Sequence, residues 1–440
     1  MSEAPWAERR LHFVGLGGAG MSGLAIVARA LGAEVGGSDA ADSAYLEGVR
    51  AAGVEPSIGH DEANLPEGDD VEVVYSTAVP PDNPERAAAR ERGLREWHRG
   101  ELLGEVSALK RCIAVTGTHG KTTTAAMLHR ILLGAGLAPS YLVGAELRET
   151  GTNAEWTEGD WLVVEADESD RSLLHVRPEI AVLTNLELDH HTTYASLLDL
   201  EATMREFLAS AGQAVVWDRP ELLALRAGSV PFDVPAPRLT PEGSWFTWEG
   251  NEVWVPVPGS HNALNAAAAL EAAALAGVAA GDARTALAEF RPAGRRFERV
   301  GETETGAEVY DDYAHHPTEV RATIDAARTL EPGRVVAAFQ PHLYSRTAAL
   351  WREFGGALAL ADVAVVLDVY RAREDPADFP GVSGLLVAEA AADAGEGRPV
   401  AWMPGFDEAE RVLRGALREG DMLLTLGAGD VDELGRRLVA

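Results

Sequence analysis

Glycine, lysine and threonine are concentrated in one short segment, GTHGKTTT at residues 117–124. The segment follows an apolar run and precedes an apolar-periodic stretch, so it predicts a loop between a β-strand and an α-helix. Backbone amides, one ammonium group and hydroxyl groups would converge there on an anion-sized site. We therefore expect a nucleoside triphosphate with Mg²⁺, although this loop has two residues between its glycines where the usual phosphate loop has four. The residues expected to bind the nucleotide are Gly117, Thr118, His119, Gly120, Lys121, Thr122 and Thr123.

Hard-cation ligands are expected downstream of this loop. Lys121 would hold the β- and γ-phosphates, and the Thr122 hydroxyl would face the metal. Glu165 ends the predicted buried strand in DWLVVEAD, and Asp189 and His190 are expected at the end of the next one, in EIAVLTNLELDHH. Ligands of open α/β sheets lie outside the carboxyl ends of the strands, so Glu165 and His190 are predicted metal ligands.

A second glycine-rich loop lies near the N-terminus. Gly15, Gly17 and Gly20 form G-x-G-x-x-G after a predicted strand, and Asp39 ends the following strand. The pattern is typical of dinucleotide binding, with the acid placed for a ribose hydroxyl. A nucleotide-linked sugar offers the same pyrophosphate and ribose, and a tight turn without any ligand is the third interpretation.

Composition restricts the class of protein. The chain has 440 residues, 46% of them hydrophobic, and a net charge of −31, which opposes binding to nucleic acid or to an anionic membrane. No apolar run predicts a membrane span, and the start has no secretory leader. The single cysteine, Cys112, fits a reducing cytoplasm and is expected to be buried. Lys110 and Lys121 are the only lysines among 38 basic residues. A GC-rich genome that favours arginine codons explains this scarcity, and it makes Lys121 informative as a compact point charge in the loop.

Strands and helices alternate along the whole chain, which predicts an α/β fold with parallel, doubly wound sheets. Apolar runs in LHFVGL, AEVGGSD, VEVVYSTAV, KRCIAVTG, GRVVAAFQ, DVAVVLDVY and DMLLTLGAG are expected strands, and residues 262–280 an expected helix. Three domains are predicted: a Rossmann-like domain over 1–108, a central P-loop ATPase-like domain over 109–294, and a Rossmann-like domain over 295–440.

The order of several motifs resembles the Mur ligases, the ATP-dependent amide-forming enzymes of peptidoglycan synthesis. These motifs are GTHGKTTT, EADESD, NLELDHHTTY, HNALNAAAAL, GRRFE, DDYAHHPTEV and FQPHLYSRT, and the resemblance extends from HFVGLGGAGMSGLA to LLTLGAGD. Together with GGAGMSGLA, the histidine at 119 indicates the alanine-adding branch. The resemblance implies UDP-N-acetylmuramate and L-alanine as substrates, with ATP and Mg²⁺, in the cytoplasm; it leaves monomer or dimer open.

The resemblance also implies roles for individual residues. The implied metal ligands are Thr122, Glu165 and His190. The residues implied to contact the adenosine part of ATP are His261, Asn262, Arg296 and Asp312. His261 and Asn262 have a helix cap as their other interpretation. The implied catalytic residues are Lys121, Glu165, His190, His315 and Arg346. The implied substrate-binding residues are Gly17, Gly18, Ala19, Gly20, Met21, Ser38, Asp39, His60, Ser76, Asn153, Tyr313, His315 and Arg346.

Two positions depart from the family pattern. In PHLYSRT, Leu343 stands where a first arginine is expected, which leaves Arg346 to bind the amino-acid carboxylate, with Arg371 and Arg373 as the next candidates. Thr192 replaces a commonly acidic residue after His190. Three other interpretations remain: a ligase that adds a recycled tripeptide to the same UDP-sugar, an NAD-dependent dehydrogenase resting on Gly15, Gly17, Gly20 and Asp39, and a non-catalytic nucleotide-binding scaffold.

Overall fold

The structure is a computed structural model that describes residues 4–190, 193–372 and 374–439. The residues group into two compact units. The first comprises residues 1–188, 196–233 and 265–293, and the second comprises 189–195, 234–264 and 294–440. Each unit is described by itself below.

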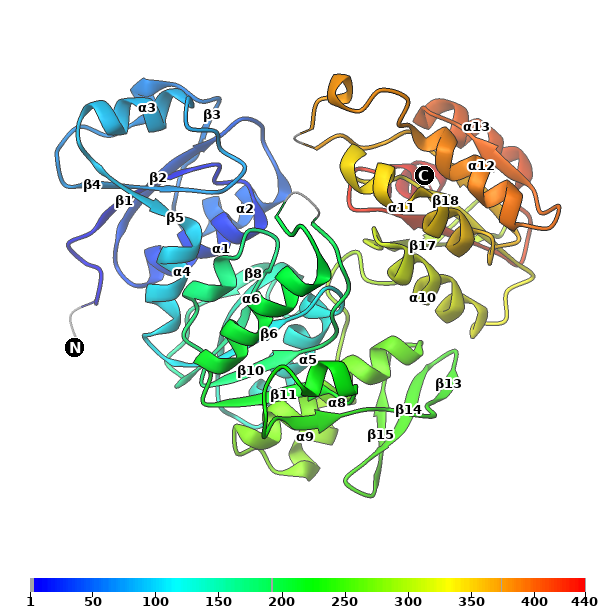
Figure 1. The fold of residues 1–440 in the computed structure, drawn as a ribbon, viewed down its shortest axis with the longest axis horizontal. Helices are drawn as coiled ribbons and strands as arrows, with labels where there is room; N and C mark the ends of the chain where they lie inside the picture. Colours follow the sequence, from blue (N-terminus) through cyan, green and yellow to red (C-terminus); the bar gives the residue numbers. More distant parts are fainter. Residues whose placement is uncertain (1–3, 191–192, 373, 440) are drawn as a thin grey trace. The chain divides into compact units, whose positions relative to one another are not determined.

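The N-terminal part of the first unit is a parallel five-stranded sheet in the order β3-β2-β1-β4-β5 (Figure 1). Its strands are β1 (Arg10–Val14), β2 (Glu34–Asp39), β3 (Ser57–Ile58), β4 (Val71–Tyr75) and β5 (Arg95–His98). Its helices are α1 (Ala19–Ala30), α2 (Ala44–Ala51), the short η1 (Glu62–Asn64), α3 (Pro84–Glu91) and α4 (Arg99–Ser107). The strand order reverses between β1 and β4, which is where ligands bind in doubly wound sheets.

The rest of the first unit is a seven-stranded sheet in the order β12-β11-β10-β6-β9-β7-β8, parallel except for the β7–β8 hairpin. Its strands are β6 (Arg111–Thr116), β7 (Ser140–Leu147), β8 (Thr152–Glu155), β9 (Trp161–Glu165), β10 (Ile180–Leu183), β11 (Gln213–Trp217) and β12 (Val230–Phe232). The accompanying helices are α5 (Lys121–Gly134), η2 (Ser172–His175), α6 (Leu197–Ser210), α7 (Pro220–Leu223), α8 (Ser260–Leu275) and α9 (Ala280–Leu287). The first five residues of α8 belong to the second unit.

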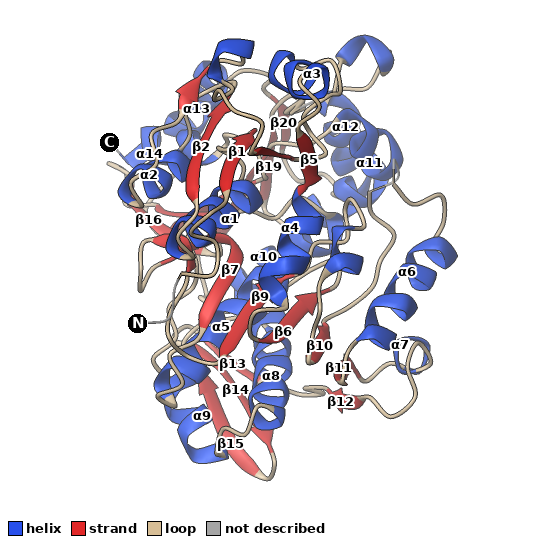
Figure 2. Cartoon of the chain, turned by 90° about the vertical axis from the view of Figure 1, so that its left-hand side faces the viewer, coloured by secondary structure: helices blue, strands red, loops and turns tan. Residues whose placement is uncertain are grey.

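The second unit contains two sheets. One is antiparallel and consists of β13 (Arg238–Thr240), β14 (Gly243–Trp248) and β15 (Asn251–Val255) (Figure 2). The other has the order β16-β17-β21-β18-β19-β20 and is parallel except for the pair β16–β17. Its strands are β16 (Glu298–Glu302), β17 (Glu308–Asp312), β18 (Arg334–Phe339), β19 (Val363–Val366), β20 (Val400–Trp402) and β21 (Asp421–Leu426). Its helices are α10 (Pro317–Arg328), α11 (Tyr344–Leu358), η3 (Pro376–Asp378), α12 (Gly384–Ala394), α13 (Phe406–Ala416) and α14 (Asp432–Val439).

Glycines let the helices of the N-terminal sheet pack closely on the rest of the first unit. A Cβ on Gly23 of α1 would lie 3.0 Å from Leu142 of β7, and one on Gly104 of α4 would lie 2.6 Å from the His175 carbonyl oxygen. Asn153 of β8 is buried and donates to the Ala19 carbonyl at 2.6 Å. The N-terminal sheet and the central sheet therefore form one body, joined through α1 and α4.

The structure confirms the predicted fold class and the strands expected from the apolar runs. Cys112 is buried in β6, as expected. One expectation is wrong: β10 ends at Leu183, so Asp189 and His190 follow it by several residues and do not end a strand. The polar sequence TNLELD has no apolar run to extend the strand. Among the described residues, no helix is long and apolar enough to cross a membrane.

Candidate active site

The phosphate loop predicted at residues 117–124 connects β6 to α5. Gly117 (φ 129°) and Gly120 (φ 78°) adopt left-handed backbone conformations that side chains rarely permit. A Cβ would also lie 2.2 Å from Thr184 Oγ1 at Gly117 and 2.3 Å from Asn265 Oδ1 at Gly120. Both glycines are therefore required by backbone conformation and by space.

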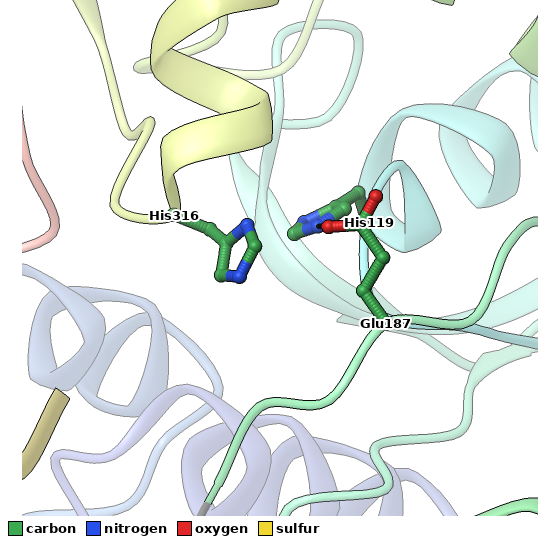
Figure 3. A group of neighbouring side chains, drawn as sticks. All are labelled: His119, Glu187 and His316. Atoms are coloured by element: carbon green, nitrogen blue, oxygen red, sulfur yellow. Dashed lines mark hydrogen bonds and ion pairs between the residues drawn. The ribbon is translucent and has the colours of Figure 1, made fainter. Parts of the chain in front are cut away.

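The segment after β10 braces this loop. Asn185 Oδ1 accepts from the His119 amide at 2.8 Å, and Thr184 Oγ1 donates to the His119 carbonyl at 2.6 Å. Thr118 Oγ1 donates to the Glu187 carbonyl at 3.0 Å. Figure 3 shows the His119 ring beside the Glu187 carboxylate, with Nε2 at 3.3 Å from Oε2. These bonds fix the direction in which the loop amides point.

Lys121, the first residue of α5, lies over the same loop. Its ammonium donates to the carbonyls of Gly117 at 2.7 Å and Thr118 at 3.2 Å, and lies 2.9 Å from Glu168 Oε2. Burial disfavours the charged ammonium, but the carboxylates of Glu168, Asp167 and Glu165 outweigh burial and raise the pKa of Lys121 above its ordinary value. Lys121 is thus a positioned, permanently charged cation, which suits phosphate binding.

Thr122 and Glu165, two of the predicted metal ligands, lie together. Thr122 Oγ1 donates to Glu165 Oε2 at 2.9 Å, and the Gly144 amide donates to the same oxygen at 2.7 Å. A hydroxyl and a carboxylate beside a phosphate loop are the oxygen donors that Mg²⁺ prefers. The chemistry of this donor pair therefore fits Mg²⁺.

The N-terminal glycine loop opens the first turn of α1, for which Gly18 is the N-cap. The Gly17 amide donates to Asp39 Oδ2 at 2.7 Å, so Asp39 holds the loop in place. The amides of Ala19 and Gly20 begin the helix and have no intrahelical acceptor, which suits an anion. The Met21 side chain is buried, so only its backbone lies at the loop.

Other predicted substrate residues of the first unit lie around this loop. Ser38 is buried near the end of β2, and its Oγ lies 3.0 Å from His60 Nδ1. Ser76 follows β4, and its Oγ would lie 3.5 Å from a Cβ on Gly15. Asn153 is held against α1 through Ala19. The structure thus brings these predicted residues to one edge of the N-terminal sheet.

A cavity of about 140 Å³ in the first unit extends from the start of α1 to Glu165 at the end of β9. Its lining includes Gly20 of α1, Gly144, Glu165, Asp167 and Arg99. Arg99 donates to Asp170 Oδ2 through Nε at 3.1 Å and through Nη2 at 2.8 Å. Its Nη1 lies 3.0 Å from the position a Cβ on Gly20 would take. The Arg99 guanidinium, the start of α1 and the Glu165 carboxylate, a predicted metal ligand, therefore share one cavity.

In the second unit, His261 and Asn262 lie in the first turn of α8. Asn262 Nδ2 donates to the Pro258 carbonyl at 2.8 Å and so braces the turn before the helix. Burial lowers the pKa of His261 to about 4, against an opposing effect of Glu319, so its imidazole is neutral at pH 7. A neutral imidazole and a side-chain amide suit contact with an uncharged nucleobase.

Four predicted residues gather around the end of β17: Arg296, which precedes β16, and Asp312, Tyr313 and His315. Asp312 accepts from the amides of Phe297 and Ala314, both at 2.8 Å, and burial raises the pKa of its carboxyl to about 7 although Arg296 opposes this. The Arg296 guanidinium lies 5.0 Å from the Tyr313 ring centroid.

The His315 side chain lies beside the same turn. Its Nδ1 is 2.9 Å from the Tyr313 carbonyl oxygen, and burial lowers the pKa of His315 to about 4. His315 is therefore neutral at pH 7.

Arg346 is held by Asp189 in a buried, bidentate ion pair, with Nε–Oδ1 at 3.1 Å and Nη2–Oδ2 at 3.0 Å. Burial acts to raise the pKa of Asp189, but Arg346 and His190 lower it far below its ordinary value. His190 has a left-handed backbone (φ 54°), and its amide donates to Asp189 Oδ1 at 2.7 Å. Thr192 and Arg373 lie outside the described residues.

Sequence reasoning missed several residues of these clusters. Glu168 lies within EADESD, and its position three residues after Glu165 on the same segment could have indicated a partner for Lys121. Asn185 follows a predicted strand, and Asn265 lies one turn after Asn262 in HNALN, so both had a weak signal. Arg99 has no motif around it, and only the fold places it in the cavity.

Comparisons with known proteins match the whole length of the chain. Mur ligase family models match in three segments: the Mur ligase family catalytic domain over residues 10–111, the Mur ligase middle domain over 115–230, and the Mur ligase glutamate ligase domain over 295–429. The UDP-N-acetylmuramate–L-alanine ligase of Streptomyces avermitilis is 43% identical, over 99% of this chain and 98% of the relative. That of Symbiobacterium thermophilum is 44% identical, over 98% of this chain and 94% of the relative.

Solved structures show the same likeness. The crystal structure of UDP-N-acetylmuramate–alanine ligase from Thermotoga maritima has a TM-score of 0.84 and 28% identity, and covers 98% of both chains. A murein peptide ligase from Psychrobacter arcticus has a TM-score of 0.69 and 24% identity, again over 98% of both chains, and this likeness concerns the fold alone.

Proposed function

The chain belongs to the Mur ligase family, and we propose that it is an ATP-dependent ligase that joins L-alanine to UDP-N-acetylmuramate. The observation that carries the proposal is the cavity that the start of α1 at Gly20 shares with Glu165. Glu165 accepts from Thr122, the residue after Lys121 in the phosphate loop. A carboxylate bound in this cavity would therefore lie near the phosphates that must activate it.

The N-terminal loop binds the diphosphate of the UDP-sugar in this proposal. The Ala19 and Gly20 amides face the anion at the start of α1, and Arg99 adds a positive charge beside them. Asp39 fixes the loop through Gly17 and has its other oxygen 3.2 Å from the Ala41 amide. Ser38, His60, Ser76 and Asn153 complete the predicted sugar-nucleotide site.

The phosphate loop binds ATP through its amides and Lys121, whose charge favours the shift of negative charge during phosphoryl transfer. Thr122 and Glu165 would hold Mg²⁺, and His190 is the predicted ligand of a second metal. When bound, the metal neutralises charge between the carboxylate and the triphosphate. The sugar carboxylate would attack the γ-phosphorus and release ADP, and the alanine amine would then attack the acyl carbon and release phosphate.

The residues of the second unit would bind L-alanine and the adenosine part of ATP. Arg346 is the predicted partner of the alanine carboxylate, and Asp189 holds its guanidinium in a fixed orientation. His315 and Tyr313 lie on the turn after β17, with Asp312 and Arg296 beside them for the nucleotide.

The three matched segments support functional domains near the predicted ranges 1–108, 109–294 and 295–440. Residues 234–264, however, cluster with the C-terminal residues and not with the central sheet. We place the reaction in the cytoplasm, where nucleotide-linked precursors and ATP occur together.

Phosphate release with ATP, Mg²⁺ and UDP-N-acetylmuramate, screened across free amino acids and the murein tripeptide, tests this function. We expect release with L-alanine and none with the tripeptide; turnover with the tripeptide alone would establish the recycling ligase instead. Gly18→Val gives a matched test of the sugar-nucleotide loop, because a Cβ at Gly18 has no described neighbour closer than the Gly15 carbonyl oxygen at 3.7 Å. The variant should fold and lose affinity for the UDP-sugar.

A further inference from the structure

A buried carboxylate lies beneath the N-terminal sugar-nucleotide site. The side chain of Glu85, in the first turn of α3, has no exposed surface, and it accepts hydrogen bonds from three elements. Ser38 Oγ donates to both of its oxygens at 2.6 and 2.8 Å, and Asn64 Nδ2 donates to Oε1 at 3.2 Å. His12 Nε2 lies 2.6 Å from Oε2, and His60 Nδ1 lies 3.1 Å from Oε1.

These donors keep Glu85 ionised inside the protein. Burial alone would raise its pKa, but the hydrogen bonds from His12, Ser38 and Asn64 lower the pKa to about 2. A buried charge is costly unless several donors satisfy it, and an apolar side chain would fill the same space without that cost. Retention of a charged group at this point therefore indicates a task beyond packing.

The position of the cluster suggests that task. Ser38 is the last residue but one of β2, and His60 follows β3 by two residues, so both lie at the carboxyl edge of the sheet. Ligands of doubly wound sheets bind outside this edge. Ser38 is fully buried, whereas 20% of the His60 side chain is exposed. His60 can therefore contact a ligand on one side while Glu85 holds it on the other.

We propose that Glu85 is a positioning residue for the uridine half of the nucleotide-sugar, acting through Ser38 and His60. This inference rests on the proposed function, since it assigns the supporting group of that same site. The Glu85 carboxylate accepts from Ser38 and His60 at once, which fixes the hydroxyl direction and the orientation of the imidazole. Asn83 caps α3 by accepting from the Glu85 amide at 3.0 Å, so the backbone that carries the carboxylate is itself fixed.

Glu72 of β4 provides a matched control in the same sheet. It too is a partly buried carboxylate with a lowered pKa, and it pairs with Arg9 at 2.8 Å and accepts from Trp97 at 2.6 Å. Its partners are Arg9 and Trp97, and neither Ser38 nor His60 is among them. Glu72→Gln therefore reports what loss of a charged anchor does to this sheet when the proposed uridine contacts are kept.

Calorimetry with UDP alone, on the full chain and without ATP, tests the inference. Glu85→Gln replaces one acceptor oxygen by an amide that donates, so Ser38 or His60 must turn away. We expect the dissociation constants for UDP and for UDP-N-acetylmuramate to rise by the same factor, about ten- to a hundredfold. The turnover number at saturating substrate and the Michaelis constants for ATP and L-alanine should stay within about twofold of the parent.

A double-mutant cycle shows whether Glu85 acts through its neighbours. In a His60→Ala background, the effect of Glu85→Gln on UDP affinity should shrink, because one of the two groups it orients is gone. If Glu85→Gln does not fold, Asn64→Ala removes a single donor to the same carboxylate and should weaken UDP binding to a smaller extent.

Equal UDP affinity in the parent and Glu85→Gln, with both Gln variants losing similar thermal stability, would overturn the inference and leave Glu85 as a structural anchor. The inference would also be wrong if Glu72→Gln weakened UDP binding as much as Glu85→Gln does. A parent chain that binds neither UDP nor UDP-N-acetylmuramate would instead refute the proposed function itself.

Discussion

Removal of Arg346 should destabilise the protein much more than removal of an exposed arginine. The side chains of Arg346 and Asp189 are only 4% and 5% exposed, and two hydrogen bonds join them. Breaking a buried pair by deleting one partner costs about 3–5 kcal/mol, because the other charge stays buried without compensation. With a urea dependence of about 2 kcal/mol per molar, Arg346→Ala should lower the urea midpoint by roughly 1.5–2.5 M.

Arg414 supplies the control, since it pairs with Glu410 at 2.9 Å on the surface of α13, where the side chains are 39% and 25% exposed. Arg414→Ala should cost only about 0.3–0.5 kcal/mol. The double variant Asp189→Ala/Arg346→Ala should be more stable than Arg346→Ala alone, because no unpaired charge remains. The Michaelis constant for L-alanine should also rise in Arg346→Ala, by about thirty- to a thousandfold, while those for ATP and UDP-sugar move little.

The pH dependence gives a further check on the same pair. Because the pKa of Asp189 is lowered in the folded chain, its ion pair contributes its full stabilisation above about pH 4, the ordinary range of an aspartate. This stabilisation is lost as the pH falls through the folded-state pKa. The difference between parent and Arg346→Ala should therefore be constant near pH 7 and shrink below about pH 4. A midpoint shift no larger than that of Arg414→Ala at pH 7 would refute this reasoning.

Three further outcomes are expected. Gly120→Ala should weaken ATP binding by roughly tenfold or more in calorimetry, because its Cβ would clash with Asn265. The control is Gly136→Ala, at a similar φ of 77° with open space around it. This control should cost about 1 kcal/mol of stability and leave ATP affinity unchanged. Glu165→Gln should raise the Mg²⁺ concentration needed for half-maximal phosphate release, and an unchanged metal dependence would make Glu165 structural. Burial lowers the pKa of His129 to about 4, so the unfolded chain binds a proton between about pH 6.5 and 4 that the folded chain excludes, and stability falls as the pH falls through that window. In His129→Phe, the free energy of unfolding measured by urea titration should therefore fall less between pH 7 and pH 4 than in the parent, by up to about 3 kcal/mol.

Much of the fold could be predicted because buried parallel strands are short apolar runs. Strands β6, β9 and β10 lie where CIAVTG, WLVVE and IAVL predict them. The antiparallel strands β13–β15 were not predicted, since they are short and half-exposed. Their grouping with the C-terminal residues depends on contacts between segments far apart in the chain, for which a single sequence carries no signal.

The candidate site divides in the same way. Thr122 and Glu165 could be placed together because both lie at the carboxyl edge of neighbouring strands, β6 and β9. The roles predicted for individual residues stay predictions until substrates are tested. Glu85 and Arg99 could not be found in advance, because each is a single charged residue on a helix and looks like surface until the fold encloses it.

The path of the chain between the two compact units limits how members of this family could be recombined. The chain passes from one unit to the other at residues 188/189, 195/196, 233/234, 264/265 and 293/294. A chimera that exchanged only residues 294–440 would import α11 with its Arg346 but keep the host's Asp189 and its β13–β15 sheet. Transfer of amino-acid specificity should therefore need all three segments of the second unit exchanged together.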